Sequence, residues 1–137
     1  MSNQPTLPTA TTTRLIDAAQ AVLGDLQLPH ENSAGAVAAA ILTNTGNIYT
    51  GINIDLSSGL GFCAEISAIA DMIKHRETHI IAVVAMCEEG VLPPCGRCRE
   101  TMAQINFANF EAQVIVSLTK TTLLKDLLPN FWMDIRK

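Results

Sequence analysis

The chain has 137 residues, which is enough for one domain with a substantial core, and 48% of its residues are apolar while 16% are charged. This composition excludes an intrinsically disordered chain, and a net charge of −4 with scattered Lys and Arg excludes a broad basic surface for nucleic acid. The longest nearly apolar run, residues 34–42, is far too short to cross a bilayer, so no membrane partner is expected.

The N-terminal residues are polar and rich in Thr and Pro, and we expect residues 1–11 to form a flexible arm before a single domain at 12–137. This stretch has neither the positive start nor the apolar centre of a secretory signal, so we expect a cytoplasmic protein. A helix is predicted next, capped by Thr12 or Thr13 and ended by Pro29. Its apolar side chains recur at helical spacing: Leu15, Ile16, Ala19, Val22, Leu23 and Leu26.

A hairpin is the next predicted unit. The segment GAVAAAILT is ambiguous, because its alanines favour a helix whereas its short length and the NTGN turn after it favour a strand. The segment IYTGINI is rich in β-branched residues, which is typical of a strand. We therefore expect strands near 36–43 and 47–54, and the residues alone leave a helix open for the first of them.

The second half of the chain alternates helices with strands, which predicts an α/β layered domain with a mixed sheet. One predicted strand is a continuous apolar run, as expected where both faces of a sheet are covered. The predicted elements are helices at 62–76 and 95–107, strands at 79–86 and 112–118, loops at 55–61 and 87–94, and a short helical turn at 121–128.

Three cysteines lie where a predicted loop becomes a helix, the position at which open α/β sheets bind ligands. Cys95 and Cys98 form a Cys-x-x-Cys pair at one helix start, and Cys63 lies at the other. Helix N-termini favour thiolates, which bind zinc. Zinc prefers four ligands in a tetrahedron, so three cysteines would leave one position open, as in catalytic sites. Glu65 follows Cys63 by two residues, which suits a general base beside the metal better than a ligand.

The segments CAE at 63–65 and PCGRC at 94–98 resemble the metal-binding motifs of the zinc-dependent cytidine deaminase family. TGNIYTGINID, LPPCGRCRETM and LLPNFW also have counterparts there, so the resemblance covers roughly residues 34–132. It implies a three-layer α/β/α sandwich around a five-stranded mixed sheet, with GAVAAAILT as a strand. It further implies hydrolytic deamination of cytidine or deoxycytidine to the uridine form with release of ammonia, as in pyrimidine salvage.

The resemblance also assigns the metal chemistry to particular residues. Cys63, Cys95 and Cys98 would bind one zinc ion per subunit, and Glu65 would carry protons between water and the cytosine ring. The implied partner is a small-molecule nucleoside and not a polynucleotide.

The resemblance places five further residues around the substrate. The backbone of Ala64 would contact the reacting side of the base. Asn53 and Asp55 match the Asn-x-Glu pair with which the family holds the ribose hydroxyls. Family members are usually homotetramers with active sites near subunit boundaries, so Phe131 or Trp132 would reach the pocket of a neighbouring subunit, and a dimer is the alternative assembly.

The chain departs from the family pattern at three places. Many cytidine deaminases have an Arg after the Glu of Cys-Ala-Glu that eases the negative charge of the thiolates, whereas this chain has Ile66. Arg97 or Arg99 is then the candidate for balancing that charge, and the combination of an apolar residue here with PCGRC resembles blasticidin S deaminases. Asp55 replaces the longer Glu, and the following loop, DLSSGLG, is slightly shorter than usual.

Three alternative interpretations remain open at this point. The substrate could be blasticidin S or another aminopyrimidine nucleoside. Cys95 and Cys98 alone would also fit a redox dithiol. Cys87 could complete a structural four-cysteine zinc site, although it follows a predicted buried strand and equally fits a small core residue.

Overall fold

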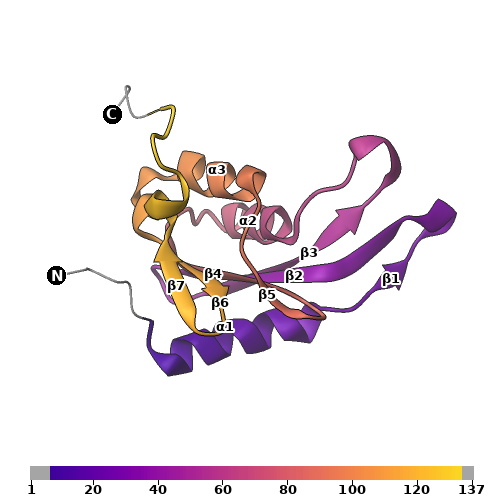
Figure 1. Cartoon of the computed structure of the whole chain (residues 1–137), viewed down its shortest axis with the longest axis horizontal. Coiled ribbons are helices and arrows are strands. Elements are labelled where there is room, and N and C mark those ends of the chain that lie inside the picture. Colours follow the sequence, from indigo (N-terminus) through magenta and orange to yellow (C-terminus); the bar gives the residue numbers. More distant parts are fainter. Residues whose placement is uncertain (1–6, 134–137) are drawn as a thin grey trace.

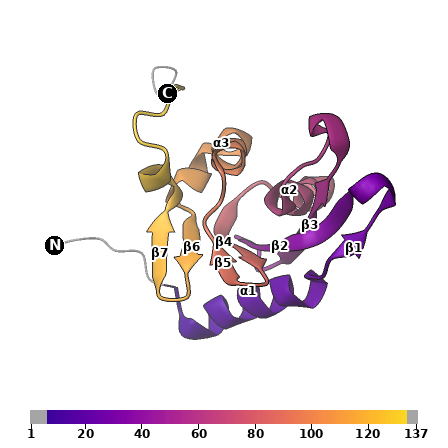
Figure 2. The ribbon, with the colours of Figure 1, turned by 45° about the vertical axis from the view of Figure 1, so that its right-hand side comes forward.

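The computed structural model describes residues 7–133, so residues 1–6 of the predicted arm lie outside the described part. Helix α1 (Thr9–Val22) covers one face of a mixed sheet, and helices α2 (Ala64–Lys74) and α3 (Gly96–Ile105) cover the other (Figures 1 and 2). The predicted three-layer α/β/α arrangement is therefore confirmed. Among the described helices, none combines the length and the hydropathy needed to span a bilayer.

The sheet has seven strands, more than the five predicted. Five longer strands form its frame in the order β3-β2-β4-β6-β7, and only the contact between β4 and β6 is parallel. The additional strands β1 and β5 have two and three residues and pair with the ends of β2 and β4. The strand bounds are β1 Leu26–Gln27, β2 Ser33–Thr43, β3 Ile48–Asp55, β4 Ile80–Cys87, β5 Gly90–Leu92, β6 Gln113–Ser117 and β7 Lys120–Leu123.

The alanine-rich segment forms β2, so its interpretation as a strand is confirmed. β2 lies between β3 and β4, and its side chains alternate between two separate cores. Ala38 and Ala40 pack with Leu15 of α1, whereas Ile41 packs with Met72 of α2 on the opposite face. Small side chains let helices approach this strand from both sides, which is why tertiary packing overrides the helical preference of alanine.

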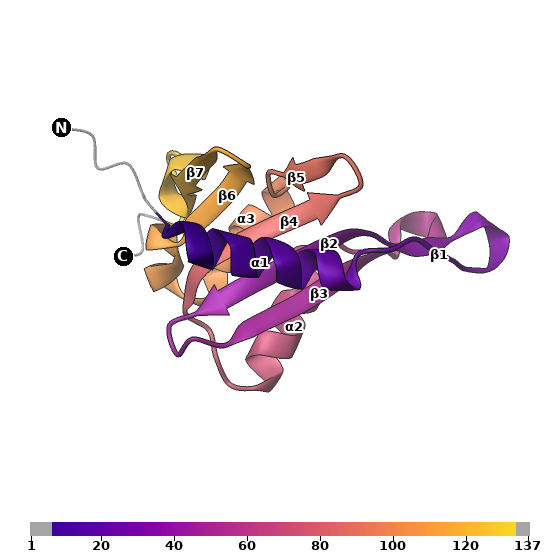
Figure 3. The same cartoon turned by 90° about the horizontal axis from the view of Figure 1, so that it is seen from below.

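The first helix differs from its prediction at both ends. It begins at Thr9, three or four residues before the expected cap at Thr12 or Thr13 and within the expected arm, and it ends at Val22, well before Pro29. The chain leaves the helix because the N–H of Gly24 donates to the carbonyl oxygen of Gly35 at 2.9 Å, which starts a run alongside β2. Hairpin β1–β2 then extends past the end of α1 (Figure 3).

Two predictions in the second half are also wrong in detail. The predicted helical turn at 121–128 begins as strand β7 and becomes a 3-10 turn only at Leu124–Leu127, because β-branched Thr121 and Thr122 pair with β6. The predicted loop at 87–94 contains β5, which folds back along β4. Other 3-10 turns lie at Pro29–Glu31, Ser57–Gly59 and Phe107–Glu111.

Gly51 is the point at which β3 and α2 come closest. A Cβ atom at Gly51 would lie 2.3 Å from the backbone nitrogen of Ala68 and 2.6 Å from the carbonyl oxygen of Ala64. No side chain fits in this space, so glycine allows α2 to lie directly on β3. Since α2 begins immediately after Cys63, this contact sets how close to the sheet the first metal motif lies.

Asn109 connects three parts of the chain in the interior. Its side chain is fully buried, and its Oδ1 accepts a hydrogen bond from the N–H of Ile80 at 2.7 Å. Its Nδ2 donates to the carbonyl oxygens of Thr78 at 3.0 Å and Met102 at 2.9 Å. Because all these groups are satisfied, Asn109 fixes the late part of α3 to the start of β4.

A carboxylate joins the β2–β3 turn to the segment after α2. Glu77 accepts hydrogen bonds from the hydroxyls of Thr45 and Tyr49 and from Nδ2 of Asn47, the last at 2.8 Å. These hydrogen bonds lower the pKa of Glu77 from 4.5 to about 2, and the bond from Thr45 makes the largest contribution. The ionised carboxylate is therefore the form that holds this end of the hairpin.

We predict that Gly51→Ala lowers the free energy of unfolding by about 1–3 kcal/mol, because the added methyl group meets backbone atoms that cannot move away cheaply. Gly24→Ala is the matched control, since a Cβ there would have no neighbour within 4 Å. Denaturant unfolding of both variants measures the difference. Equal stability of the two variants would show that α2 can shift without cost.

We predict that Glu77→Gln removes a pH-dependent part of the stability. The folded pKa lies below the unfolded one, so the contribution is fully present above pH 4.5 and is lost as the pH falls towards about 2. Unfolding curves of wild type and variant should therefore differ near neutral pH and converge in acid. Glu111→Gln, which removes an exposed partner of Lys125, is the control and should change stability little.

Candidate metal centre and active site

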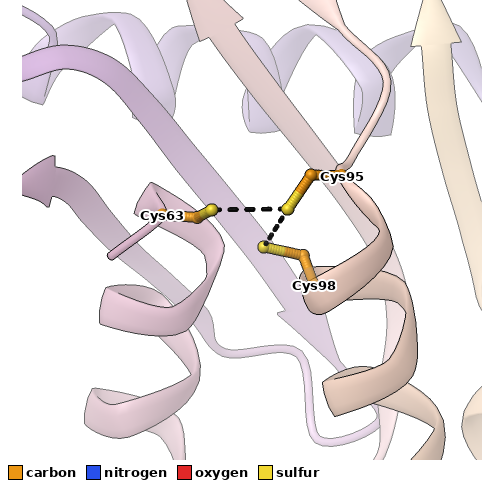
Figure 4. Close-up of side chains that lie close together, drawn as sticks. All are labelled: Cys63, Cys95 and Cys98. Carbon is orange, nitrogen blue, oxygen red and sulfur yellow. Dashed lines mark hydrogen bonds between the residues drawn. The ribbon is translucent and has the colours of Figure 1, made fainter. Parts of the chain in front are cut away.

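The side chains of Cys63, Cys95 and Cys98 point towards one another across the facing ends of α2 and α3 (Figure 4). Their sulfur atoms all lie within 4.8 Å of one another. The Sγ of Cys95 is 3.4 Å from that of Cys63 and 3.6 Å from that of Cys98. The structure thus brings together the three cysteines predicted to bind metal.

Local helix geometry explains this convergence. Cys63 and Cys95 are the residues immediately before α2 and α3, and Cys98 lies one turn into α3 on the same side as Cys95. Four thiolates placed tetrahedrally at about 2.3 Å from zinc would be about 3.8 Å apart, so the observed sulfur spacing fits three of them. A set of soft thiolate donors of this kind selects zinc over magnesium or calcium.

The ionisation of the three thiols supports a cation between them. Burial raises the pKa of Cys63, and burial together with the charge of Glu65 raises the pKa of Cys98. Burial also opposes ionisation of Cys95, but hydrogen bonds from backbone N–H groups, chiefly that of Cys98, hold its pKa below the usual value. Three neighbouring thiolates therefore require a positive charge among them, which a coordinated metal supplies.

Glu65 lies in the first turn of α2 and is only 4% exposed. Burial raises the pKa of its carboxyl group above the usual value. The carboxylate lines the same pocket as Cys63 and Cys95, so the predicted proton carrier lies beside the predicted metal site. A buried carboxyl whose pKa is raised holds a proton more readily than an exposed one, which suits a group that takes up and releases protons during catalysis.

The pocket at the metal site has a volume of about 420 Å³, which is in the range of small-molecule sites. Ala64 lies on its wall, and the contact of its backbone with the base stays a prediction. The wall is formed by Val37, Asn53, Ile54, Asp55, Leu56, Gly59, Gly61, Phe62, Cys63, Ala64, Glu65, Ala85, Leu92, Pro93, Cys95 and Arg97.

The amide of Asn53 has a fixed orientation in this pocket. Its Oδ1 accepts a hydrogen bond of 2.9 Å from the backbone N–H of Val37, which lies at an irregularity in the pairing of β2 with β3. Since a backbone N–H can only donate, the amide oxygen must face Val37, and the NH₂ group is left for the pocket. Asp55, which is exposed, adds an acceptor to the same wall.

Phe131 and Trp132 do not line the pocket of their own chain. Phe131 is 6% exposed and packs edge-on against Phe110, with ring centres 5.0 Å apart. Trp132 is 58% exposed, and its Nε1 donates to Oε2 of Glu100 at 3.0 Å. A contact of either residue with a neighbouring subunit stays a prediction.

The two arginines near the metal motif face different surroundings. Arg97 is exposed and lines the pocket. Arg99 is half-buried, and its guanidinium donates to the carbonyl oxygens of Pro94 and Leu127. Ile66 packs against the core shared by α2 and α3 and brings no charge to the thiolates.

Sequence reasoning missed several residues of the pocket wall. Leu92 and Pro93 could have been found, because they directly precede the PCGRC motif. Val37 and Ala85 lie in β2 and β4, and nothing in an apolar strand sequence marks the residue that borders a pocket. Their position follows from the strand register and from the irregularity in β2.

A three-thiolate site with a buried carboxylate in a pocket, at the start of two helices on an α/β sheet, defines a hydrolytic metalloenzyme. Residues 11–114 match the sequence model described as the cytidine and deoxycytidylate deaminase zinc-binding region, and the chain belongs to this family. The predicted family, its zinc cofactor and its hydrolytic deaminase class are thereby confirmed.

Individual relatives agree with this assignment. The chain is 33% identical over 101 residues to a probable cytidine deaminase of Dictyostelium discoideum, covering 72% of this chain and 66% of that protein. It is 32% identical over 102 residues to a cytidine deaminase of Mycobacterium tuberculosis, covering 72% and 74%. The crystal structure of cytidine deaminase from Mycobacterium leprae superposes with a TM-score of 0.74 at 29% identity, covering 87% of this chain and 98% of that one.

We predict that Cys98→Ser loses stoichiometric zinc, whereas Cys87→Ser retains it. Among the described residues the cluster contains only three cysteines, and the thiol of Cys87 instead donates to Glu89 at 3.1 Å. Metal analysis of the purified variants measures the difference. Loss of zinc from Cys87→Ser would instead favour a structural four-cysteine site.

Proposed function

We propose that this chain deaminates cytidine or deoxycytidine to the uridine form and releases ammonia. The observation that carries the proposal is the buried carboxylate of Glu65 beside three converging thiols in a pocket of nucleoside size. The curated relatives described above as cytidine deaminases support the same substrate.

Cys63, Cys95 and Cys98 would hold the zinc ion. Bound there, zinc would supply Lewis acidity and lower the pKa of water to about 7. Glu65 takes a proton from the attacking water and delivers it to the ring nitrogen beside C4. The oxygen of water bonds to C4, Glu65 then moves the remaining proton of this oxygen to the amine, and the C4–N bond breaks as the C4 carbonyl forms. Cytidine and water thus give uridine and ammonia, with Glu65 unchanged at the end.

The pocket walls match the polarity of a nucleoside. The backbone of Ala64, at the start of α2, lies on the pocket wall and would contact the reacting end of the base. The NH₂ group of Asn53 and the carboxylate of Asp55 form a donor and an acceptor on one wall. A sugar hydroxyl accepts and donates at once, so one such group can satisfy both residues.

Arg97 is the favoured candidate for balancing the charge of the metal centre. Three thiolates on a divalent zinc leave a net charge of −1, and Ile66 provides no compensation. Arg97 lies between ligands Cys95 and Cys98 in the chain and lines the pocket. Its guanidinium would act on the thiolates through the pocket, without coordinating the metal.

Blasticidin S or another aminopyrimidine nucleoside is the second candidate substrate. The observation that favours it is Ile66 combined with Arg97 inside the metal motif, a departure from common cytidine deaminases. The short loop with the 3-10 turn Ser57–Gly59 borders the pocket and could change its fit. Cytoplasmic location and a homotetramer or dimer stay predictions, and light scattering in solution tests the assembly.

Ammonia release from cytidine, deoxycytidine, cytosine and blasticidin S tests the substrate directly. We predict turnover of cytidine and deoxycytidine well above that of free cytosine, because the base alone cannot engage Asn53 and Asp55. The same assay after zinc removal and zinc return is the control. Turnover of blasticidin S alone would replace the leading substrate with the second one.

We predict that Glu65→Gln keeps the fold and the zinc but lowers kcat by at least 10²–10⁴-fold, the usual contribution of a general acid–base group. Glutamine has the same shape and cannot carry protons. Circular dichroism and metal analysis verify the fold and the zinc content of the variant. Near-wild-type turnover by this variant would contradict the mechanism.

A further inference from the structure

Arg99 lies one residue after the ligand Cys98, in the first part of α3. Its Nε donates to the carbonyl oxygen of Pro94 at 2.8 Å, and its Nη1 donates to that of Leu127 at 3.5 Å. Helical side chains point towards the helix N-terminus, so Arg99 reaches back to the residue just before Cys95. Both acceptors are backbone carbonyl oxygens, and neither is a cysteine sulfur.

The peptide before Cys95 needs an external donor to hold it. Pro93 and Pro94 have no N–H groups, so this segment cannot tie itself to the sheet through donors of its own. Pro94 is buried, and its carbonyl oxygen therefore requires a hydrogen bond. The guanidinium of Arg99 provides it and so restrains the backbone from which the Cys95 thiol extends.

The other end of the guanidinium contacts a turn that packs on the core. Leu127 ends the 3-10 turn Leu124–Leu127, in which Leu124 is fully buried. Leu127 itself packs against the core that α2 and α3 share. In Figure 1 this turn, which follows β7, lies beside α3. Arg99 thus connects the metal-binding loop to the core through two backbone contacts.

We propose that Arg99 is a positioning residue of the zinc site: it holds the Pro94–Cys95 peptide where the Cys95 thiolate meets those of Cys63 and Cys98. The inference rests on the three-cysteine zinc site of the proposed function and not on the choice of substrate. Under it, the charge of the thiolates is balanced elsewhere, and Arg99 contributes geometry.

Zinc affinity separates geometry from charge. The apoprotein and its Arg99→Met and Arg99→Lys variants are titrated with zinc against a chromophoric chelator. We expect Arg99→Met to bind zinc about 10–100-fold more weakly, the usual effect of losing a group that orients a ligand. Arg99→Lys keeps the charge, but an ammonium lacks the planar fork that spans two carbonyls, so its affinity should also fall by about tenfold.

Two further measurements identify the cause. The losses should be the same at low and high salt, because a positioning effect is not screened whereas a charge effect is. The cobalt-substituted variants should show shifted thiolate-to-cobalt bands, because the ligand geometry has changed. Zinc-free thermal unfolding of each variant shows that a loss of affinity is not a loss of fold.

Two variants are matched controls. Lys125→Met removes a positive charge that is paired with Glu111 at 3.0 Å, from the turn that anchors Arg99, and leaves the carbonyl oxygen of Leu127 in place. Glu100→Ala removes the acceptor of Trp132 from the residue next to Arg99 on the same helix. Both should bind zinc as the wild type does.

Wild-type zinc affinity and an unchanged cobalt spectrum in Arg99→Lys would overturn the inference, as would a salt-sensitive loss confined to Arg99→Met. A wild-type chain that binds no zinc would overturn it together with the proposed function. Tight zinc binding that depends on Arg99, without ammonia release from any nucleoside, would support the inference and reject only the proposed substrate.

Discussion

The mutual repulsion of three thiolates is the constraint on which the rest of the structure depends. Sulfur atoms 3.4–3.6 Å apart can ionise together only around a cation, and they reach this spacing only if two helices begin at the same place. Contacts with the sheet hold the two helices in this position. Gly51 lets α2 lie directly on β3, and Asn109 fixes α3 to the start of β4. The geometry of the metal centre therefore depends on the packing of α2 and α3 on the sheet and not on one loop.

The chemistry of the site was predictable because it depends on residues close together in the sequence. Cys95 and Cys98 are one helical turn apart, and Glu65 is two residues from Cys63, so local geometry alone placed each pair. The resemblance to a known family joined the two motifs. The ambiguity of the alanine-rich segment could not be resolved from its residues, because two covering helices, and not alanine itself, make it a strand.

The errors share a different physical origin. The helix at Thr9–Val22 ends early because Gly24 pairs with Gly35, and β7 forms because Thr121 and Thr122 pair with β6. The contact between Arg99 and Leu127, which are 28 residues apart, was not predictable from the sequence for the same reason. In each case backbone groups distant in the chain decide the structure, and side-chain patterns carry little information about them.

The hydrogen bond between Val37 and Asn53 limits how the pocket can evolve. The donor is a main-chain amide, which every residue except proline possesses, so substitution at Val37 leaves the amide of Asn53 turned the same way. The backbone at Val37, and not its side chain, therefore determines that Asn53 turns its NH₂ group to the pocket. A change of substrate at this wall of the pocket would therefore require a substitution of Asn53 or a change in the backbone path of β2. Otherwise the change must come from residues on the other walls of the pocket.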